Sequence, residues 1–389
     1  MVLDASIVGL GKVGLTRDAT APAIELARRA VLAASKDAGL RLDAVDGLLI
    51  CRTSAATDAV LGLDLQRSLG LRDLKLLQVV LCEGASSISA IQTAALAVTA
   101  GVATTVACVF ADTPVVPGQP ARSGFGRLKT TTGVEGLRYS AGLFGGAATY
   151  ALSAQRYLAQ YGVDEEYLAG VATSTRAWAE LSPEAMFRSP LTRESYFAAR
   201  YIAEPLRLYD CAIPVNGAVA VIVTTRSRAA DLEQPVVHIL AAAQGHPGLP
   251  DRSGFDRAIV SGGQVAAAAM YEQSGIHAPD ITACQLYDAF SICPLLSLEA
   301  YGFAAAGTAG ELFRDGSTRP GGRLPVNTGG GHLSGYYLQG MTPVAEAVTQ
   351  ARGQAGDRQV TADTILVTND GGRFDYHAGM ILGTAGQWS

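Results

Sequence analysis

The chain has 389 residues, of which 49% are hydrophobic and 17% charged, so it can bury a large core and is not a mainly disordered protein. Its net charge of −5, with no run of basic residues, gives no reason to expect a nucleic-acid partner. The N-terminal segment lacks a basic stretch before a long apolar one, and no apolar run reaches about 18 residues, so we expect neither a secretion signal nor a membrane span.

The cysteines lack the spacing of a metal site. None forms a C-x-x-C pair or a zinc-ribbon pattern, so we expect no metal, and thiols that stay reduced in the cytoplasm. The six residues are Cys51, Cys82, Cys108, Cys211, Cys284 and Cys293.

The first part of the chain alternates strand-like and helix-like segments. The apolar pattern predicts strands at 4–10, 45–51, 74–82 and 104–112, and helices at 19–39 and 84–101. The helix at 84–101 carries Ser and Ala on every side, so we expect it to be buried. This succession predicts parallel strands joined by right-handed crossovers.

A long excursion interrupts this alternation. Residues 113–142 have the composition of loops, and loops of this length are usually functional or lie at an interface. The arginines within 122–138 suit either CoA phosphates or a partner surface, and the sequence does not choose between them. Helices near 145–160 and 164–180, an irregular segment and a strand at 217–225 follow.

The second half repeats the strand-helix-strand order. We expect strands at 235–245, 281–290, 364–372 and 376–384, and helices near 257–275, 292–302 and 335–352. The predicted organisation is therefore an N-terminal half, 1–230, which contains an excursion at about 113–215, and a C-terminal half, 231–389.

Four stretches of the chain resemble the thiolase superfamily, especially the sterol-carrier-protein type thiolases and the bacterial lipid-transfer thiolase-like proteins. The segment 84–112 is similar to the nucleophile helix and following strand of that fold. "YDAF" at 287–290 stands where the family has N-E-A-F or H-D-x-F. "NTGGGHLSGYYLQGM" at 327–341 stands in place of the glycine turn with G-H-P, and "VTNDGG" at 367–372 in place of C-x-G-G. The resemblance implies a duplicated, five-layered α/β/α/β/α fold with a sheet in each half.

The functional positions of a thiolase have changed chemistry in this chain. The nucleophilic cysteine belongs at the start of the buried helix, where backbone amides and the helix dipole favour a thiolate, and that position is Gly84. The active-site residues of N-E-A-F and G-H-P fall on Tyr287 and Tyr337, and the second cysteine falls on Asn369. Two phenols indicate a repurposed site, similar to the thiolase-like aldolases that cleave steroid side chains.

This resemblance implies retro-aldol cleavage of a β-hydroxyacyl-CoA, with a steroid side chain or another bulky acyl group, to a ketone or aldehyde and propionyl-CoA or acetyl-CoA. No covalent acyl-enzyme and no cofactor beyond the CoA thioester substrate are needed. In our hypothesis Tyr337 handles the hydroxyl proton and Tyr287 protonates or holds the enolate, although the two roles can be exchanged.

Further candidates surround the two tyrosines. The N–H groups of Gly84 and Ala85 are candidates to cradle oxygen charge, and Gly84 is expected to leave room for a bulky substrate. Asp288 either tunes Tyr287 or braces the chain, and Asn369 is expected to orient the site. His332 lies in the glycine turn, where a histidine is often solvated or bonded locally.

Two other classes of function remain open, along with the assembly. One is an ordinary acyltransferase or thiolase that uses Cys82 as its nucleophile; the other is a non-catalytic lipid or acyl-CoA binding protein. The resemblance also implies a homodimer whose strands pair across a twofold axis, and a separate small OB-fold and zinc-ribbon partner in a heterotetramer.

Overall fold

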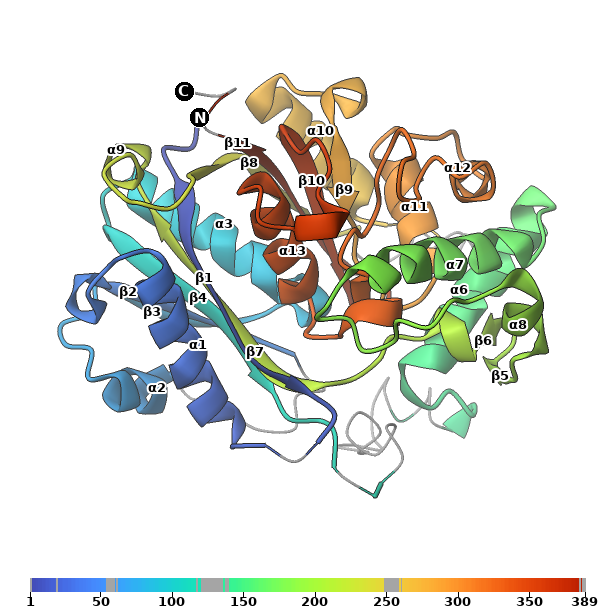
Figure 1. Ribbon diagram of the computed structural model, residues 1–389, viewed down its shortest axis with the longest axis horizontal. Helices are drawn as coiled ribbons and strands as arrows, with labels where there is room; N and C mark the ends of the chain where they lie inside the picture. Colours follow the sequence, from blue (N-terminus) through green and yellow to red (C-terminus); the bar gives the residue numbers. More distant parts are fainter. Residues whose placement is uncertain are drawn as a thin grey trace.

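The computed structural model describes residues 2–18, 20–53, 60, 62–116, 118–119, 136, 140–247, 259, 261–384 and 386. Figure 1 shows a mixed α/β molecule built around one large twisted sheet. Most of the excursion predicted at 113–142, including its arginines at 122–138, lies outside the described residues. No helix in the described part is both long and apolar enough to cross a membrane.

In the described part of the chain, nine strands form the central sheet in the order β3-β2-β4-β7-β1-β8-β11-β10-β9. They are β1 Ser6–Thr16, β2 Gly47–Arg52, β3 Leu76–Leu81, β4 Thr105–Asp112, β7 Asn216–Thr224, β8 Val237–Gly245, β9 Ala283–Gln285, β10 Thr364–Gly371 and β11 Tyr376–Thr384. A separate hairpin consists of β5 Tyr201–Ala203 and β6 Leu206–Arg207.

The two halves of the sheet share one pairing pattern. In the first half β1 pairs antiparallel with β7, β7 antiparallel with β4, and β4 parallel with β2. In the second half β8, β11, β10 and β9 repeat these relations in the same order. The halves join where β1 meets β8 through two residue pairs, so their strands form one continuous sheet. The division into halves at residue 230 stays a prediction.

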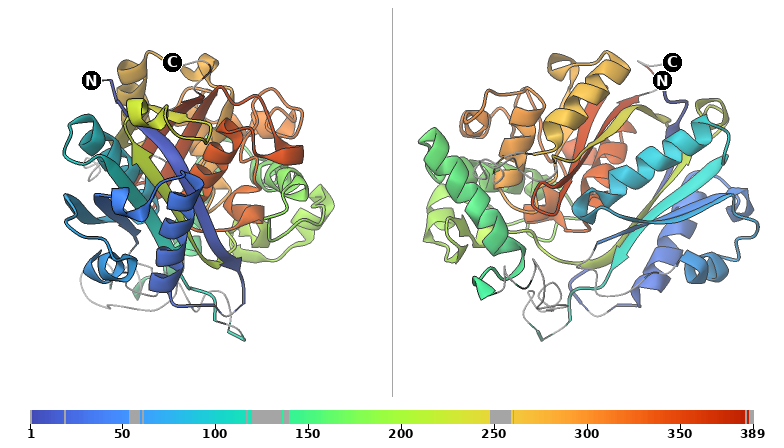
Figure 2. Two further views of the ribbon diagram at one scale, coloured as in Figure 1. Left: turned by 60° about the vertical axis from the view of Figure 1, so that its left-hand side comes forward. Right: turned by 180° about the vertical axis from the view of Figure 1, so that it is seen from behind.

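Helices separate the sheet halves into layers. The helices are α1 Ala23–Asp37, α2 Gly62–Leu69, α3 Ser86–Thr99, α6 Gly145–Tyr161, α7 Glu166–Leu181, α8 Arg193–Ala198, α9 Arg226–Ala229, α10 Gly263–Ser274, α11 Ile292–Ala300, α12 Ala309–Arg314 and α13 Met341–Ala351. α1 covers the first half of the sheet and α10 the second, whereas α3 and α13 contact each other and strands of both halves. The predicted five-layered fold is confirmed, and the right-hand view of Figure 2 shows α3 from behind.

The central position of α3 follows from its composition. Ten of its residues are buried, and they are Ser86, Ser87, Ile88, Ser89, Ala90, Ile91, Ala94, Ala95, Ala97 and Val98. Small side chains let strands approach from two sides, and the hydroxyls bond to carbonyls of the preceding turn, as Ser89 does with Ala85 at 2.9 Å. The expectation of a buried helix is confirmed, although the α-helix begins at Ser86 after a short 3₁₀ turn, Glu83–Ala85.

Two predicted elements near the glycine turn differ from the structure. The strand expected at 281–290 ends at Gln285, because side chains replace its ladder partners: Leu286 N–H donates to Asn327 Oδ1 at 2.6 Å and Tyr287 N–H to Thr368 Oγ1 at 3.3 Å. The helix expected at 335–352 begins only at Met341. The short helix α12 has no counterpart in the sequence-based expectation.

Candidate functional site

A glycine-rich turn carries one side of the site. Gly330 and Gly331 adopt φ values of +90° and +53°, which L-side chains rarely adopt, and the chain then forms a single π-helical turn, Gly331–Gly335. A Cβ on Gly330 would lie 2.7 Å from the Ala179 side chain of α7. The glycines therefore allow the turn to sit directly against α7.

Asp288 braces this turn. Its carboxylate accepts hydrogen bonds from the backbone N–H groups of His332, at 2.7 Å, and Leu333, at 3.4 Å, and it is fully buried. No hydrogen bond joins Asp288 to a phenol in the described residues. Of the two roles expected for Asp288, the contacts support bracing.

The hydroxyl groups of Tyr287 and Tyr337 lie 2.9 Å apart. Tyr287 also donates to Gln339 Oε1 at 3.0 Å, and because a carbonyl oxygen only accepts, the shared hydrogen bond runs from the Tyr337 hydroxyl to that of Tyr287. Tyr287 is 3% exposed, whereas Tyr337 is partly exposed. The structure thus brings together the two tyrosines that the sequence singles out, and leaves Tyr337 the more accessible.

Burial shifts both phenols in the same direction. It raises the pKa of Tyr287 well above its ordinary value, and the neighbouring Tyr337 raises this pKa further. Burial also raises the pKa of Tyr337, while the hydrogen bond with Tyr287 lowers it in part. Both phenols are therefore protonated at neutral pH and suit donation of a proton or hydrogen bond better than abstraction of a proton.

Gly84 does not leave an empty space. A Cβ there would lie 2.4 Å from the Tyr287 hydroxyl oxygen and 2.0 Å from the Asp370 carbonyl oxygen. The expectation that Gly84 makes room for a bulky substrate is wrong, because the phenol of Tyr287 fills the position where a thiolase nucleophile would stand.

The start of α3 holds the remaining candidates from the first half. Ala85 N–H donates to the Cys82 carbonyl at 3.0 Å, so this proposed oxyanion donor is already in use. Cys82 is partly buried, and this burial raises the pKa of its thiol, although a hydrogen bond with Ser89 opposes the shift. A cysteine that acts as a nucleophile needs a lowered thiol pKa instead, because the thiolate is the reactive form.

His332 is buried between the two rings but is held on both sides. Its ring centroid lies 4.8 Å from that of Tyr287 and 4.9 Å from that of Tyr337. Nδ1 accepts from Asp288 N–H at 3.2 Å, and Nε2 donates to the Gln339 carbonyl at 2.8 Å. The Asp288 carboxylate also lies 3.1 Å from Nδ1, so the ring is held in place beside the phenols, and a solvated histidine is ruled out by its complete burial.

Asn369 links the two central helices. Its Oδ1 accepts from Ile88 N–H of α3 at 3.2 Å, and its Nδ2 donates to the Gly340 carbonyl, directly before α13, at 3.2 Å. These contacts support the orienting role expected for Asn369.

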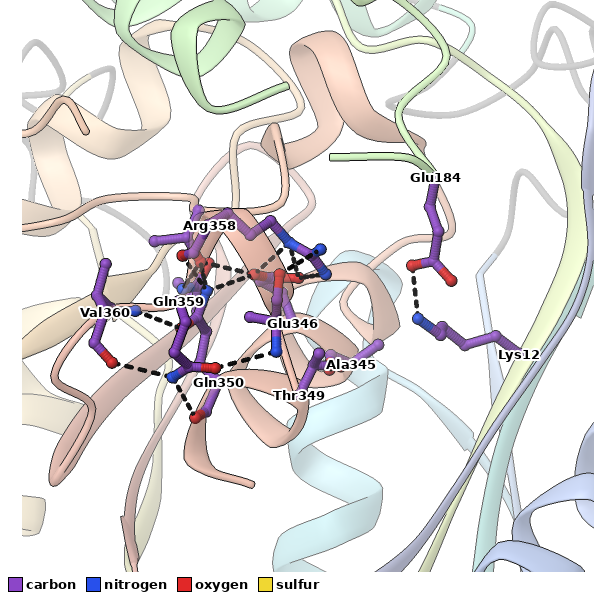
Figure 3. A network of polar contacts seen from close by, with 12 residues as sticks. Lys12, Glu184, Ala345, Glu346, Thr349, Gln350, Arg358, Gln359 and Val360 are labelled. Carbon is purple, nitrogen blue, oxygen red and sulfur yellow. Dashed lines mark hydrogen bonds and ion pairs between the residues drawn. The ribbon is translucent and has the colours of Figure 1, made fainter. Parts of the chain in front are cut away.

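A buried polar network around Glu346 and Arg358, drawn in Figure 3, holds the Thr328 side chain next to the glycine-rich turn. Glu346 of α13 pairs with Arg358 at 3.0 Å and accepts a hydrogen bond from the Thr328 hydroxyl at 2.7 Å. Gln285 at the end of β9 donates to the same Thr328 hydroxyl at 2.8 Å. The segments that carry Tyr287 and Tyr337 are therefore tied to each other and to α13.

Sequence reasoning missed three residues of the site. Gln339 accepts from Tyr287, and Tyr150 of α6 stacks on Phe290 with ring centroids 4.6 Å apart. Cys293 of α11 is buried close enough to influence the pKa values of Tyr150, Tyr287 and Tyr337. Gln339 lies inside the glycine-rich motif and was open to detection there, but no local pattern indicates Tyr150 or Cys293. Among the described residues no cluster of His, Cys, Asp and Glu suits a metal ion.

Comparison with known proteins places the chain in a family. A family model described as "Thiolase C-terminal domain-like" matches residues 252–384. The chain is 35% identical to the "17-hydroxy-3-oxo-4-pregnene-20-carboxyl-CoA lyase" of Mycobacterium tuberculosis, with 97% of this chain and 99% of that protein covered. It is 33% identical to the "Steroid side-chain-cleaving aldolase" of Thermomonospora curvata, with 97% of both chains covered.

Solved structures that are similar to this chain come from the same family as these relatives. The "Ltp2-ChsH2(DUF35) aldolase" matches with a TM-score of 0.87 and 32% identity, over 99% of this chain and 98% of that one. Human mitochondrial 3-ketoacyl-CoA thiolase shares the fold at a TM-score of 0.70 and 13% identity, over 99% of each chain. This protein therefore belongs to the thiolase superfamily, and within it to the thiolase-like aldolases, enzymes that act as lyases on CoA thioesters.

Proposed function

We propose that this enzyme cleaves the side chain of a bulky β-hydroxyacyl-CoA, with a steroid as the preferred body, by a retro-aldol reaction. The products are a ketone or aldehyde and propionyl-CoA or acetyl-CoA. The observation that carries the proposal is the phenol pair, with oxygens 2.9 Å apart, where a thiolase has its sulfur and imidazole groups. The names of two relatives that cover 97% of the chain support the steroid body.

The phenols serve the cleavage as hydrogen-bond donors and acids. Tyr337, the more exposed of the two, takes part in moving the hydroxyl proton as the Cα–Cβ bond breaks. The enolate that forms on the thioester oxygen accepts a hydrogen bond from a phenol, and a phenol returns a proton to Cα. The hydroxyl of Tyr287 already donates its hydrogen bond to Gln339. Tyr287 therefore acts mainly through its contact with Tyr337.

We further propose that the chain works as a homodimer together with a small DUF35 subunit of OB-fold and zinc-ribbon type, in a heterotetramer. The structural relative that covers 99% of this chain is named together with a DUF35 protein, which supports such a partner. The free state of all six cysteines supports the cytoplasm as the place of work.

The test compares Tyr287→Phe and Tyr337→Phe with the adjacent Tyr336→Phe, which removes a hydroxyl from the core instead of the pair. A panel of β-hydroxyacyl-CoAs, with and without the DUF35 partner, is analysed by mass spectrometry for ketone and shorter acyl-CoA. We expect turnover to fall about 100-fold or more for the first two variants and to stay near wild type for the third.

Wild-type turnover in all three variants would refute the role of the phenol pair. A covalent acyl-thioester at Cys82 would favour an acyltransferase instead. Binding of acyl-CoA without products, with or without the partner, would identify a carrier.

A further inference from the structure

Three arginines are buried in the described part of the chain, and one of them lacks a carboxylate partner. Arg358 pairs with Glu346 at 3.0 Å, and Arg352 pairs with Asp37 at 2.7 Å. Arg176 of α7 is 6% exposed and forms no ion pair with a described residue. A buried charge without a counter-charge is costly, so an anion from outside the described chain would stabilise Arg176.

The guanidinium group of Arg176 is held in place on two of its three nitrogens. Nε donates to the Ser334 hydroxyl of the π-helical turn at 2.8 Å, and Nη1 donates to the Ser189 carbonyl at 2.9 Å. The ring centroids of Phe187 and Tyr209 lie 5.7 and 5.6 Å from Cζ. Nη2 has no hydrogen-bond partner among the described residues and is not sealed from solvent, so its N–H groups are available to a ligand.

A second arginine contacts the same ring. Arg17, directly after β1, places Cζ 5.9 Å from the ring centroid of Phe187, which is 40% exposed, and forms no ion pair with a described residue. The carboxylate of Glu184, three residues before Phe187, is already paired with Lys12 at 2.5 Å. Two guanidinium groups without a carboxylate partner in the described chain therefore lie at one exposed ring.

Other arginines that contact aromatic rings in the described chain do have a carboxylate partner. Arg193 lies over Phe197 and pairs with Glu166. Arg207 also lies over Phe197 and pairs with Glu165 at 3.1 Å. The missing counter-charge is thus particular to the two arginines at the Phe187 ring.

Burial makes the charge of Arg176 unfavourable in the described chain alone. It lowers the pKa of the guanidinium group, and the charges of Tyr209 and Glu180 offset this effect only in part. Glu180 lies one turn further along α7 but does not form an ion pair with Arg176. An anion at Nη2 would supply the negative charge that this surrounding lacks.

We propose that Arg176 and Arg17 bind a phosphate group in the CoA part of the substrate. Enzymes of this family act on CoA thioesters, and guanidinium groups bind phosphate oxygens through their N–H donors. The pantetheine arm of CoA separates the phosphates from the thioester, so a phosphate site belongs at the surface, away from the reacting bond. Ser334 precedes Tyr337 by three residues, so the arginine that binds the phosphate also holds the turn that carries a phenol. This inference rests on the proposed function for the identity of the ligand and adds the residues that bind it.

The test measures the Kd of CoA at several salt concentrations by isothermal titration calorimetry for the full-length wild type and Arg176→Met. Methionine keeps much of the length and apolar packing of the arginine but removes its charge. We expect the Kd to rise about tenfold or more, because a charged hydrogen bond to the phosphate is lost. The Kd should also become less sensitive to salt, since one charge contact fewer is screened.

Arg17→Glu is a second variant that leaves the buried residue in place. Its carboxylate lies beside the Phe187 ring and competes with the phosphate for Arg176, so the Kd of CoA should again rise about tenfold. The matched control is Arg193→Met, which removes an arginine that lies over a ring but already has its partner in Glu166. This control should keep the Kd within about threefold of wild type.

Dephospho-CoA, which lacks the 3′-phosphate, identifies the phosphate that is bound. If it binds the wild type as weakly as CoA binds Arg176→Met, the 3′-phosphate is the ligand. If it binds the wild type as CoA does and loses affinity in Arg176→Met, the pyrophosphate is the ligand. Either result supports the proposed site.

A Kd of CoA in Arg176→Met within about threefold of wild type would overturn the inference. So would a weaker Kd with unchanged salt dependence, because Arg176 would then only support the turn. Should Arg176→Met fail to fold, an unchanged Kd in Arg17→Glu refutes the site equally. Cleavage is assayed separately: a wild type that binds CoA through Arg176 but cleaves nothing refutes the proposed reaction, whereas an active enzyme with an unchanged Kd in Arg176→Met refutes only this inference.

Discussion

Gln339 determines the direction of the hydrogen bonds in the phenol pair. Its side-chain oxygen accepts a hydrogen bond from the Tyr287 hydroxyl, so that this hydroxyl is left to accept one from Tyr337. Its backbone carbonyl holds His332 at 2.8 Å, and its own φ of +51° is unusual for a residue other than glycine. Gln339 therefore positions both Tyr287 and His332, and does so from a strained backbone conformation.

We predict that Gln339→Gly separates the effect of the backbone conformation on stability from the effect of the side-chain amide on activity. The left-handed backbone becomes easier, so the free energy of unfolding should stay within about 1 kcal/mol of wild type. Without the amide, Tyr287 loses its acceptor, and kcat should fall about tenfold, since a misdirected hydrogen bond costs on the order of 1 kcal/mol. Urea unfolding and steady-state kinetics measure the two effects.

The matched control is Asp73→Gly, which relieves a φ of +51° on the exposed surface away from the site. It should preserve kcat. Equal kcat values for Gln339→Gly and wild type would contradict the ordering role of the amide.

At the scale of elements, Asp210 joins the segment after β6 to the start of α11. Ser291 and Tyr196 donate to its carboxylate at 2.6 and 2.7 Å, and Arg207 N–H does so at 2.6 Å. Burial nevertheless raises the pKa of Asp210 to about 6, and the three hydrogen bonds offset only part of this effect. The junction therefore contains a carboxylate that titrates close to physiological pH.

This raised pKa predicts a pH-dependent stability. Because folded Asp210 holds its proton more tightly than the unfolded chain, its contribution favours folding at about pH 4 and is lost as pH rises to about 6. The free energy of unfolding of wild type relative to Asp210→Asn should fall by about 2 kcal/mol between about pH 4 and 6 and level off about one pH unit higher. Urea unfolding of both proteins between pH 4 and 8 checks this, and parallel curves would contradict it.

Periodicity in the sequence predicts the elements that are stabilised by burial, and fails where side chains replace backbone ladders. α3 and the strands around it follow their apolar pattern closely. The expected helix at 335–352 starts late because Tyr336 is extended, with φ −155°, and Tyr337 N–H donates to the Ile213 carbonyl at 3.0 Å. That partner lies more than a hundred residues away in the chain, where no local pattern reveals it.

The same distinction applies to the site. Tyr287 and Tyr337 were found because they occupy motif positions of a family. The sequence did not reveal that the space at Gly84 is occupied. That depends on how far the Tyr287 side chain, from the second half of the chain, reaches toward the central helix. Tyr150 and Cys293 come from helices whose approach to the phenols is set by tertiary packing alone.

At the scale of the molecule, β3 is one of the two edge strands of the described sheet, and β9 is the other. β3 exposes Val79 by 46% and Leu81 by 54%, which is unusual for apolar side chains on an edge strand. This edge is the place where the proposed homodimer would pair its strands.

We predict that Val79→Lys weakens the dimer, because a charged side chain on an edge strand opposes pairing with a second copy. Light scattering coupled to size-exclusion chromatography should show a shift toward monomer at micromolar concentration. Val265→Lys, which adds the same charge at a 57% exposed position on α10, should leave the mass unchanged. An unaltered dimer in Val79→Lys would place the interface elsewhere.

The contact between Tyr287 and Gly84 limits which side chains can be introduced at position 84. Restoring cysteine at position 84 alone would force its side chain into the phenol and into the Asp370 carbonyl, so a return to sulfur chemistry cannot begin there. A smaller side chain at 287 would relieve only the clash with the ring, and the backbone at Asp370 would have to shift as well. Positions 84, 287 and 370 are therefore sterically coupled, and no single substitution can put a cysteine side chain back at the start of the central helix without moving its neighbours.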